Sequence, residues 1–246
     1  MKSKHNMPHV QLPQSDFQYL EKISFFQNYT SAQIIKLLHL FEIKKHNHHQ
    51  TVFEEGEPAK YFYLIIDGYY KLSKYFHNFE SGLLGENKKE IIISISRKND
   101  FVGILLMTNP QSIYPVTMTS LGQSSVLQIP QQTYLTEWIL NPDIVAHTQK
   151  FIYNRCQKFH FGLNLNHLSL EKKVIQFLSH FLIESSEALF LPITRKEIAN
   201  LLGANCESVI RIMSSLEKKG IIKTKKGVIE IIYPPQLFEL IQNKCF

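Results

Sequence analysis

The sequence of 246 residues has few cysteines and no long apolar run. Its three cysteines, Cys156, Cys206 and Cys245, lie far apart and form no CxxC pair, so we expect neither a disulfide framework nor a cysteine-ligated zinc site. Reduced thiols are typical of a cytoplasmic protein. No apolar run reaches the roughly 18 residues of a membrane span, and the N-terminal segment MKSKHNMPHVQLPQ lacks the apolar core of a signal peptide. We therefore expect a cytoplasmic chain without a membrane partner.

Sequence patterns of catalysis are also missing. We find no nucleophile–base arrangement, no glycine-rich phosphate loop and no spaced pair of carboxylates, so we expect no enzymatic activity and no cofactor. Hydrophobic residues make up 44% of the chain and charged residues 20%, which is the balance of an ordinary globular protein. The formal net charge of +6 is compatible with a nucleic-acid partner but does not establish one.

The order of sequence patterns predicts an α+β chain. Residues 15–42 have apolar positions at helix spacing, whereas residues 51–136 contain short β-branched and aromatic runs separated by glycine and proline turns. Many short strands of this kind indicate an antiparallel β-roll, or jelly roll. We expect residues 1–140 to form this roll domain, residues 141–165 a long helix and residues 166–246 a C-terminal domain.

The long helix carries one apolar stripe. It opens at Asn141–Pro142–Asp143, and apolar or small side chains then recur every three or four residues. Such a stripe can pack on its own roll or form a seam with a second copy of the helix. The helix length favours the seam. The predicted dimer interface consists of Ile144, Ile152, Cys156 and Phe159.

The C-terminal domain contains the sharpest pattern, ITRKEIANLLGANCESVIRIMSSLEKKGIIKTKKGVIEII, at residues 193–232. Thr194 and Glu197 have the spacing of a capping box at the start of a helix, and Gly203 is suited to end that helix. Asn205 can cap a second helix, which Gly220 ends. Two short helices around a glycine-containing turn indicate a helix-turn-helix, and the hairpin after them supplies a wing.

The polar face of the second helix carries the candidate base-reading residues. Glu207 and Arg211 are four residues apart, near the helix end that enters the major groove in this motif. Arginine can bond both acceptors of guanine, and glutamate can accept from the cytosine amino group. The alternative is a surface salt bridge between the two side chains, but the capped motif around them favours DNA reading. The predicted base-reading set is Glu207, Arg211, Cys206 and Ile210.

These residues resemble the Crp/Fnr family of bacterial transcription regulators. The family pattern TRxEIAxxLGxxxExVxRxxxxLExxGxI is met from Thr194 to Ile222. The segment VFEEGEPAKYFYLIIDGYYKL (52–72) and the segment DFVGI (100–104) are similar to the family's cyclic-nucleotide-binding-type roll. The resemblance implies a jelly-roll sensor, a long dimerisation helix and a winged helix-turn-helix, with double-stranded DNA, a second copy of the chain and RNA polymerase as partners.

The resemblance also suggests which residues contact phosphates. It places Arg195 near a DNA phosphate, and the wing tip supplies two lysines. Phosphate contacts position a protein on DNA, whereas base contacts specify the sequence. The predicted phosphate-contacting residues are Arg195, Ser208, Lys225 and Lys226.

The chain departs from the family where cyclic AMP binds. Members that bind this nucleotide carry a glutamate for the ribose and an arginine for the phosphate, and the aligned residues here are Ile104 and Tyr114. No Lys or Arg occurs from residue 99 to 149, and a buried phosphate needs a cation or a cluster of backbone donors. We therefore expect no cyclic AMP. Any effector bound near residues 101–136 should be neutral or apolar. No iron–sulfur cluster is expected, because no cysteine precedes Cys156.

Two alternatives remain at this point. His46 and His48 alternate, so both could lie on one face of a strand and bind a metal, as in a cupin-like enzyme. His77 could in principle bind haem. The helix-turn-helix argues against an enzyme, which has no use for it, and we expect no metal site. The other alternative is a regulator that needs no effector and is controlled by its abundance.

Overall fold

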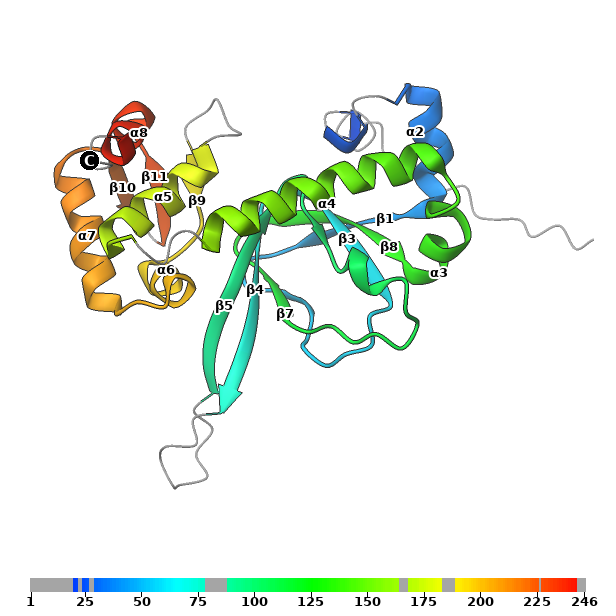
Figure 1. Ribbon diagram of the computed structural model, residues 1–246, viewed down its shortest axis with the longest axis horizontal. Helices are drawn as coiled ribbons and strands as arrows, with labels where there is room; N and C mark the ends of the chain where they lie inside the picture. Colours follow the sequence, from blue (N-terminus) through cyan, green and yellow to red (C-terminus); the bar gives the residue numbers. More distant parts are fainter. Residues whose placement is uncertain are drawn as a thin grey trace, which may run out of the picture.

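The computed structural model describes residues 20–21, 24–26, 29–77, 88–163, 168–182, 189–225 and 227–242. It consists of an antiparallel β-roll, one long helix beside the roll and a C-terminal head made mostly of helices (Figure 1). The roll and the head each have a hydrophobic core of their own. The predicted α+β class, with an N-terminal roll and a C-terminal helix-turn-helix, is confirmed.

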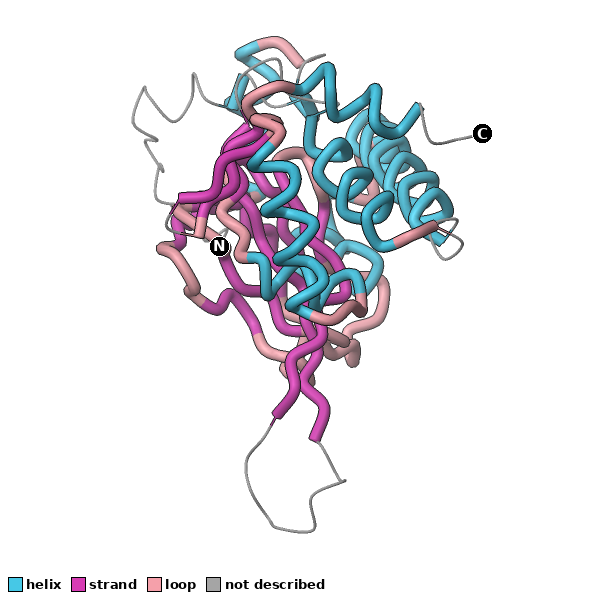
Figure 2. Tube along the Cα trace, turned by 90° about the vertical axis from the view of Figure 1, so that its left-hand side faces the viewer, coloured by secondary structure: helices cyan, strands magenta, loops and turns pink. Residues whose placement is uncertain are grey.

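The roll consists of two four-stranded antiparallel sheets. The first has the order β1-β8-β3-β6, formed by β1 (Glu42–His46), β8 (Ser124–Pro130), β3 (Tyr61–Asp67) and β6 (Phe101–Val102). The second has the order β2-β7-β4-β5, formed by β2 (Thr51–Phe53), β7 (Thr117–Ser120), β4 (Tyr69–His77) and β5 (Lys88–Arg97). Strands β4 and β5 form a ribbon that extends away from the body (Figure 2).

Gly68 turns the chain from one sheet to the other. Its φ of 75° is left-handed, and a Cβ atom there would lie 2.2 Å from the Ser124 hydroxyl oxygen. Only glycine tolerates both the dihedral and this close approach. The turn places β3 in the first sheet and β4 in the second.

Aromatic side chains fill the end of the roll beside the long helix. Phe25 stacks on Trp138 with ring centroids 5.6 Å apart, and Phe62 meets the edge of the same indole. The indole N–H donates a hydrogen bond to Thr148 Oγ1 at 3.1 Å, so the buried nitrogen is satisfied by the long helix. This packing attaches the helix to the roll.

The segments around these sheets are short helices. The N-terminal ones are η1 (Ser24–Phe26), α2 (Ser31–Leu37) and η2 (Leu38–Leu40), and the others are η3 (Ile104–Leu106), α3 (Gln131–Thr133) and the π-helix η4 (Tyr134–Trp138). The predicted helical span 15–42 is therefore only partly helical, because β1 begins at Glu42. Residues 15–19, 22–23 and 27–28 of that span lie outside the described residues.

The long helix α4 (Pro142–Leu163) has its predicted stripe turned toward its own roll. Ile144 is 0% exposed in the roll core, and Ile152 packs against the same core. The roll covers Ile144 fully and Ile152 in part, and the part of these two residues in a dimer seam stays a prediction. Cys156 is exposed, and the Phe159 side chain lies outside the description.

The head contains more structure than the sequence patterns predict. Its helices are α5 (Leu170–Leu182), α6 (Arg195–Leu202), α7 (Cys206–Lys218) and α8 (Pro234–Gln242), and its strands are β9 (Leu189–Leu191), β10 (Ile222–Lys225) and β11 (Val228–Ile231). The wing hairpin β10–β11 gains β9 as a third strand, in the order β10-β11-β9. No helix among the described residues is long and apolar enough to span a membrane.

Candidate nucleic-acid interface and ligand pocket

The two helices of the helix-turn-helix begin and end at their predicted residues. Thr194 Oγ1 accepts from the Glu197 N–H at 3.2 Å, and Glu197 Oε2 accepts from the Thr194 N–H at 2.9 Å. Gly203 is left-handed, with a φ of 60°, where α6 ends. Asn205 Oδ1 accepts from the Glu207 N–H at 2.8 Å and caps α7. These local bonds fix how α7 leaves the turn.

One face of α7 is buried and the other is presented to solvent. Val209, Met213 and Leu216 lie in the head core. Glu207, Ile210 and Arg211 are exposed together on the opposite face, and Ile210 keeps 38% of its surface exposed. A single exposed apolar residue is ordinary on a protein surface, so the candidate binding face is defined by the two charged side chains together with Ile210.

The alternative salt bridge is not formed. Within the described residues, no ion pair joins Glu207 to Arg211; the Arg211 guanidinium instead donates to Ser208 Oγ at 3.5 Å, a long contact. Both charged groups are therefore available to a ligand. Half-buried Ser214 lies two turns after Glu207 on this side of the helix, where its spacing of seven residues places it.

Cys206 does not belong to the exposed stripe. It is half-buried and packs against the head core, because it lies three residues before Val209 and seven before Met213. Base reading by Cys206 stays a prediction, with only part of its side chain exposed. Ser208 is half-buried as well.

Arg195 is tied into the head by an ion pair. Its Nη2 atom lies 2.7 Å from Glu217 Oε2, and Glu217 Oε1 accepts from the Thr224 N–H of the wing at 2.9 Å. Burial alone raises the pKa of Glu217, but the hydrogen bond from Thr224 and the charge of Arg195 outweigh it and hold the pKa below its ordinary value. Arg195 thus connects α6, α7 and β10. Lys225 is exposed at the end of β10, and Lys226 lies outside the described residues.

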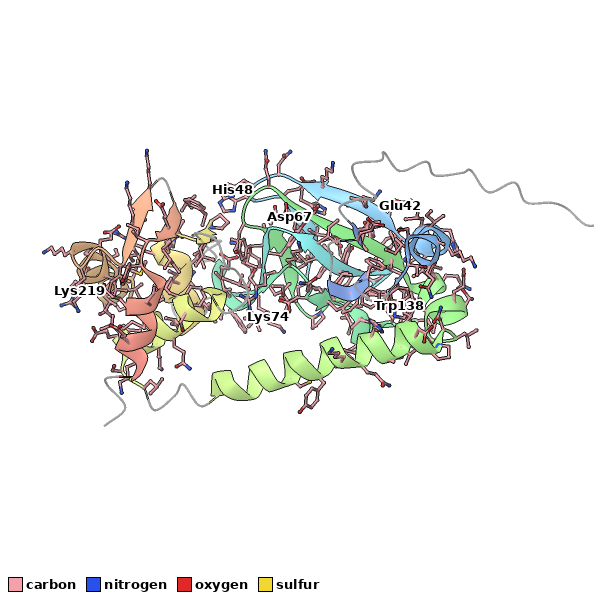
Figure 3. The ribbon with its side chains drawn as sticks, turned by 90° about the horizontal axis from the view of Figure 1, so that it is seen from above. Glu42, His48, Asp67, Lys74, Trp138 and Lys219 are labelled. Atoms are coloured by element: carbon pink, nitrogen blue, oxygen red, sulfur yellow. The ribbon has the colours of Figure 1, made fainter. Side chains whose placement is uncertain are left out.

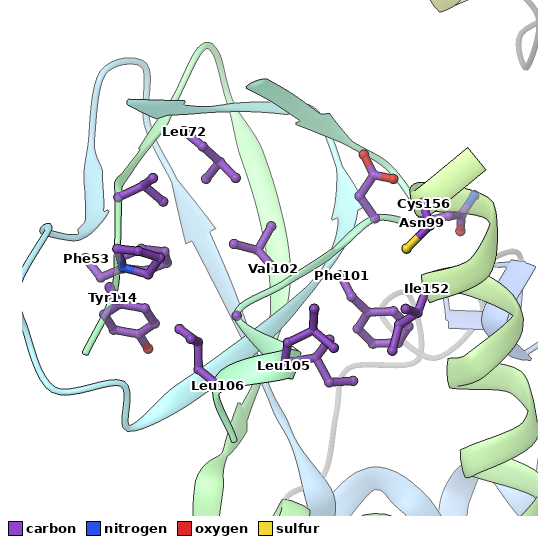
Figure 4. A pocket seen from close by; sticks show the side chains of 15 residues that line it. Phe53, Leu72, Asn99, Phe101, Val102, Leu105, Leu106, Tyr114, Ile152 and Cys156 are labelled. Atoms are coloured by element: carbon purple, nitrogen blue, oxygen red, sulfur yellow. The ribbon is translucent and has the colours of Figure 1, made fainter. Parts of the chain in front are cut away.

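The roll contains a pocket of about 430 Å³ beside α4 (Figure 4). Phe53 and Tyr114 lie at one end, and Ile152 and Cys156 of α4 lie at the other. The remaining lining residues come mainly from the segment after β5: Leu72, Asn99, Asp100, Phe101, Val102, Gly103, Ile104, Leu105, Leu106, Pro115 and Val116. Its volume lies within the usual range of about 300–1,000 Å³ for ligand pockets.

The pocket wall is apolar and offers no cation. Asp100 is the charged side chain among the lining residues, and it already accepts from the Arg97 N–H at 3.0 Å. Tyr114 has its hydroxyl between the Tyr61 carbonyl, to which it donates at 2.6 Å, and the Tyr61 N–H, from which it accepts. Burial raises the pKa of Tyr114, so the phenol stays neutral. An anion placed here would meet no opposite charge.

The histidines do not converge on a metal. Strand β1 ends at His46, so His48 lies in the following turn and the two do not share a strand face. His46 Nδ1 lies 2.9 Å from the Tyr70 hydroxyl, and His48 Nδ1 lies 2.6 Å from the Leu121 carbonyl oxygen. Among the described residues no group of three His, Cys, Asp or Glu could hold a metal ion. The His77 side chain lies outside the description.

Comparisons with known proteins match both parts of the chain. A cyclic nucleotide-binding domain model matches residues 43–137, and a Crp-like helix-turn-helix domain model matches residues 172–240. The anaerobic regulatory protein of Bacillus subtilis (strain 168) is 26% identical over 200 residues, which cover 78% of this chain and 80% of that protein. The cAMP-activated global transcriptional regulator CRP of Salmonella typhimurium (strain LT2) is 25% identical over 196 residues, which cover 77% and 89%.

Solved structures share the fold. FixK2 from Bradyrhizobium japonicum superimposes with a TM-score of 0.61 at 18% identity, covering 81% of this chain and 96% of that one. A transcriptional regulator of the CRP family from Thermus thermophilus superimposes with a TM-score of 0.63 at 14% identity, with the same coverage. The curated relatives are regulators by name.

Proposed function

The chain belongs to the Crp/Fnr family of DNA-binding transcription regulators, and from this premise we propose that it binds DNA as a homodimer and reads a near-palindromic operator. The observation that carries the proposal is the exposed stripe of α7, where Glu207, Ile210 and Arg211 face solvent without an ion pair between the two charges. Two such helices on a symmetric dimer would enter successive major grooves about one helical turn apart.

The residues of the head that we expect to contact DNA fall into base-reading and phosphate-contacting groups. Arg211 and Glu207 read a G·C pair by hydrogen bonds, and Ile210 contacts an apolar base edge. Lys225 and Lys226 of the wing contact phosphates, as does Ser208 at the start of α7. Arg195 positions the wing through Glu217, and 28% of its side chain remains exposed for a phosphate. RNA polymerase is the proposed protein partner, because these relatives regulate transcription. Such a regulator acts where bacterial DNA lies, in the cytoplasm.

The dimer surface we propose is the outward face of α4. Its inward face packs on the roll, whereas its opposite side is exposed at the described side chains from Pro142 to Tyr153 (Figure 3). Exposed residues recur there at heptad-like spacing, and Tyr153 keeps 62% of its surface exposed. The spaced, exposed residues are Pro142, Ala146, Gln149 and Tyr153.

The effector we propose is neutral or largely apolar, and it is not cyclic AMP bound in the usual way. The pocket is lined by aliphatic and aromatic side chains, with Ile104 and Tyr114 at the positions where cyclic-AMP-binding relatives carry the glutamate and arginine. A phosphate transferred there would lose its hydration without gaining a cation. An apolar ligand would gain burial at no electrostatic cost.

Selection of bound DNA from a random pool tests this function. The expected result is a near-palindrome with half-sites about one helical turn apart. Enrichment of a single half-site would contradict the homodimer, and no enrichment would contradict sequence-specific reading. The selection is repeated with a cell extract. A change in the amount of operator DNA recovered indicates a small-molecule effector, whereas an unchanged amount favours a regulator controlled by its abundance.

A further inference from the structure

A buried cluster of charges joins the roll to the head. Lys71 of β4 lies 2.8 Å from Glu90 of β5 and 3.5 Å from Glu197 of α6, measured between the amine nitrogen and one oxygen of each carboxylate. The three side chains are only 9%, 20% and 10% exposed, in that order. Lys71 and Glu90 belong to the roll, and Glu197 belongs to the head. The amine therefore bridges the two bodies.

Glu197 also caps the first helix of the helix-turn-helix. Its Oε2 atom accepts from the backbone N–H and the hydroxyl of Thr194, both at 2.9 Å, and so closes the capping box of α6. Its Oε1 atom faces Lys71. The carboxylate that fixes the start of the helix-turn-helix thus also receives the amine of the roll.

Apolar contacts surround this cluster. Tyr69, two residues before Lys71 on β4, and Ile95, paired with Lys71 on β5, pack against the head core. Helix α6 packs against β5 (Figure 1). Burial lowers the pKa of Lys71, but the hydrogen bond and charge of Glu90 and the charge of Glu197 outweigh it and raise the pKa. The amine is therefore charged, and a desolvated pair of this kind is costly to break from one side.

We propose that Lys71 is a positioning residue for operator binding, which acts through Glu197 by fixing the orientation of the head on the roll. The proposal rests on the DNA-binding function above. In the orientation that the contact holds, the reading face of α7 is exposed and DNA can reach it. The next residue of β4, Leu72, lines the pocket, so one strand carries adjacent side chains to the pocket and to the head.

Glu197→Gln is the central test. Glutamine also serves as the third residue of a capping box, so α6 keeps its cap while Lys71 loses its charged partner in the head and keeps Glu90 in the roll. The full-length variant is titrated on the selected operator and on scrambled DNA near pH 7.5. We expect operator affinity to fall about tenfold and affinity for scrambled DNA to change less than twofold. A fall that is equal on both DNAs would overturn the proposal, as would unchanged or tighter operator binding.

Three further variants separate positioning from folding. Lys71→Arg keeps the charge and should restore operator affinity to within about twofold. Lys74→Met is the matched control, because Lys74 lies on the same strand and pairs with Glu55 of the roll at 3.2 Å; it should bind the operator like the wild type. Lys71→Met combined with Glu197→Gln should lose no more operator affinity than Lys71→Met alone.

Melting temperatures are measured for every variant. Lys71→Met leaves two buried carboxylates without their cation, so this variant can unfold. In that case the operator affinities of Glu197→Gln and Lys71→Arg alone test whether Lys71 positions the head. Additive losses in the double variant, or failure of arginine to restore affinity, would overturn the proposal. If the wild-type chain itself prefers no sequence, the DNA-reading function fails, which is distinct from failure of a variant alone.

Discussion

Replacement of Tyr153 by glutamate is expected to separate the dimer into folded monomers. Tyr153 lies on the outward face of α4 and is 62% exposed in the single chain, so its removal leaves the roll core intact. In a dimer joined through this face, the tyrosine would be covered by the partner helix. A glutamate would instead place two like charges near each other across the symmetry axis.

The size of the effect follows from the area covered. Burying an exposed aromatic side chain of this size removes roughly 100 Å² from water, which stabilises a dimer by about 2.5 kcal/mol per chain at about 25 cal/mol per Å². Two symmetric tyrosines contribute about 5 kcal/mol, roughly a 10³- to 10⁴-fold change in the dissociation constant. Loss of the dimer also removes simultaneous contact with two half-sites, so operator binding should weaken steeply.

Light scattering over a concentration series measures the change, with Ile144→Ala as the control. Ile144 is 0% exposed in the roll, so this truncation should cost about 2–5 kcal/mol of unfolding free energy and leave the folded chain dimeric. A Tyr153→Glu chain that stays dimeric at micromolar concentration would refute the outward seam. If Ile144→Ala gave monomers without lowering the free energy of unfolding, the dimer interface would lie on the inward face of α4.

Three further predictions concern the reading face, the wing and the pocket. If the apolar base edge that Ile210 contacts is a thymine methyl of the selected operator, replacing that thymine by deoxyuridine should weaken binding of the wild-type chain about fourfold, because a methyl contact is worth about 0.8 kcal/mol. Binding of the Ile210→Ala variant should not change, and equal losses for both chains in gel-shift titrations would contradict the contact. The lowered pKa of Glu217 stabilises the folded head above its ordinary value of 4.5, and this contribution is lost as pH falls through the folded value. Glu217→Gln should therefore remove part of the fall in melting temperature between about pH 5 and pH 3. An unchanged pH profile would contradict a stabilising role for the contacts of Glu217 with Arg195 and Thr224. Calorimetry with cyclic AMP and cyclic GMP should show no micromolar binding; clear binding of either nucleotide would overturn the argument from the missing cation.

The helix-turn-helix could be predicted residue by residue because its determinants are local. A capping box spans four residues, and the caps at Thr194, Gly203 and Asn205 each act within one turn of the chain. The order of roll, long helix and head could also be predicted, since strand and helix periods differ. The half-burial of Cys206 could not be predicted, because the surroundings of a side chain in the first helical turn depend on the angle at which α7 leaves the turn.

The rest depends on contacts between distant segments. The apolar stripe of α4 has the same period whether it packs on the roll or on a partner helix. The hydrogen bond between Trp138 and Thr148 holds this stripe against the roll. Strand β9 has only three residues and exists because it pairs with β11, far along the chain. Lys71 carries no sequence pattern at all. Its contact with Glu197 appears only once the roll and the head are placed together.

Binding of an Arg211→Ala variant to the operator and to scrambled DNA, at several salt concentrations, tests the central claim most directly. Lys225→Ala is the matched control, because both side chains are exposed cations of the head. If α7 reads bases, Arg211→Ala costs about 1–3 kcal/mol on the operator and flattens discrimination at one G·C pair. Lys225→Ala instead weakens both DNAs alike and lowers the salt dependence by about one counterion. An equal loss on both DNAs for Arg211→Ala would make Arg211 a phosphate contact and contradict the assignment of α7 as the reading helix.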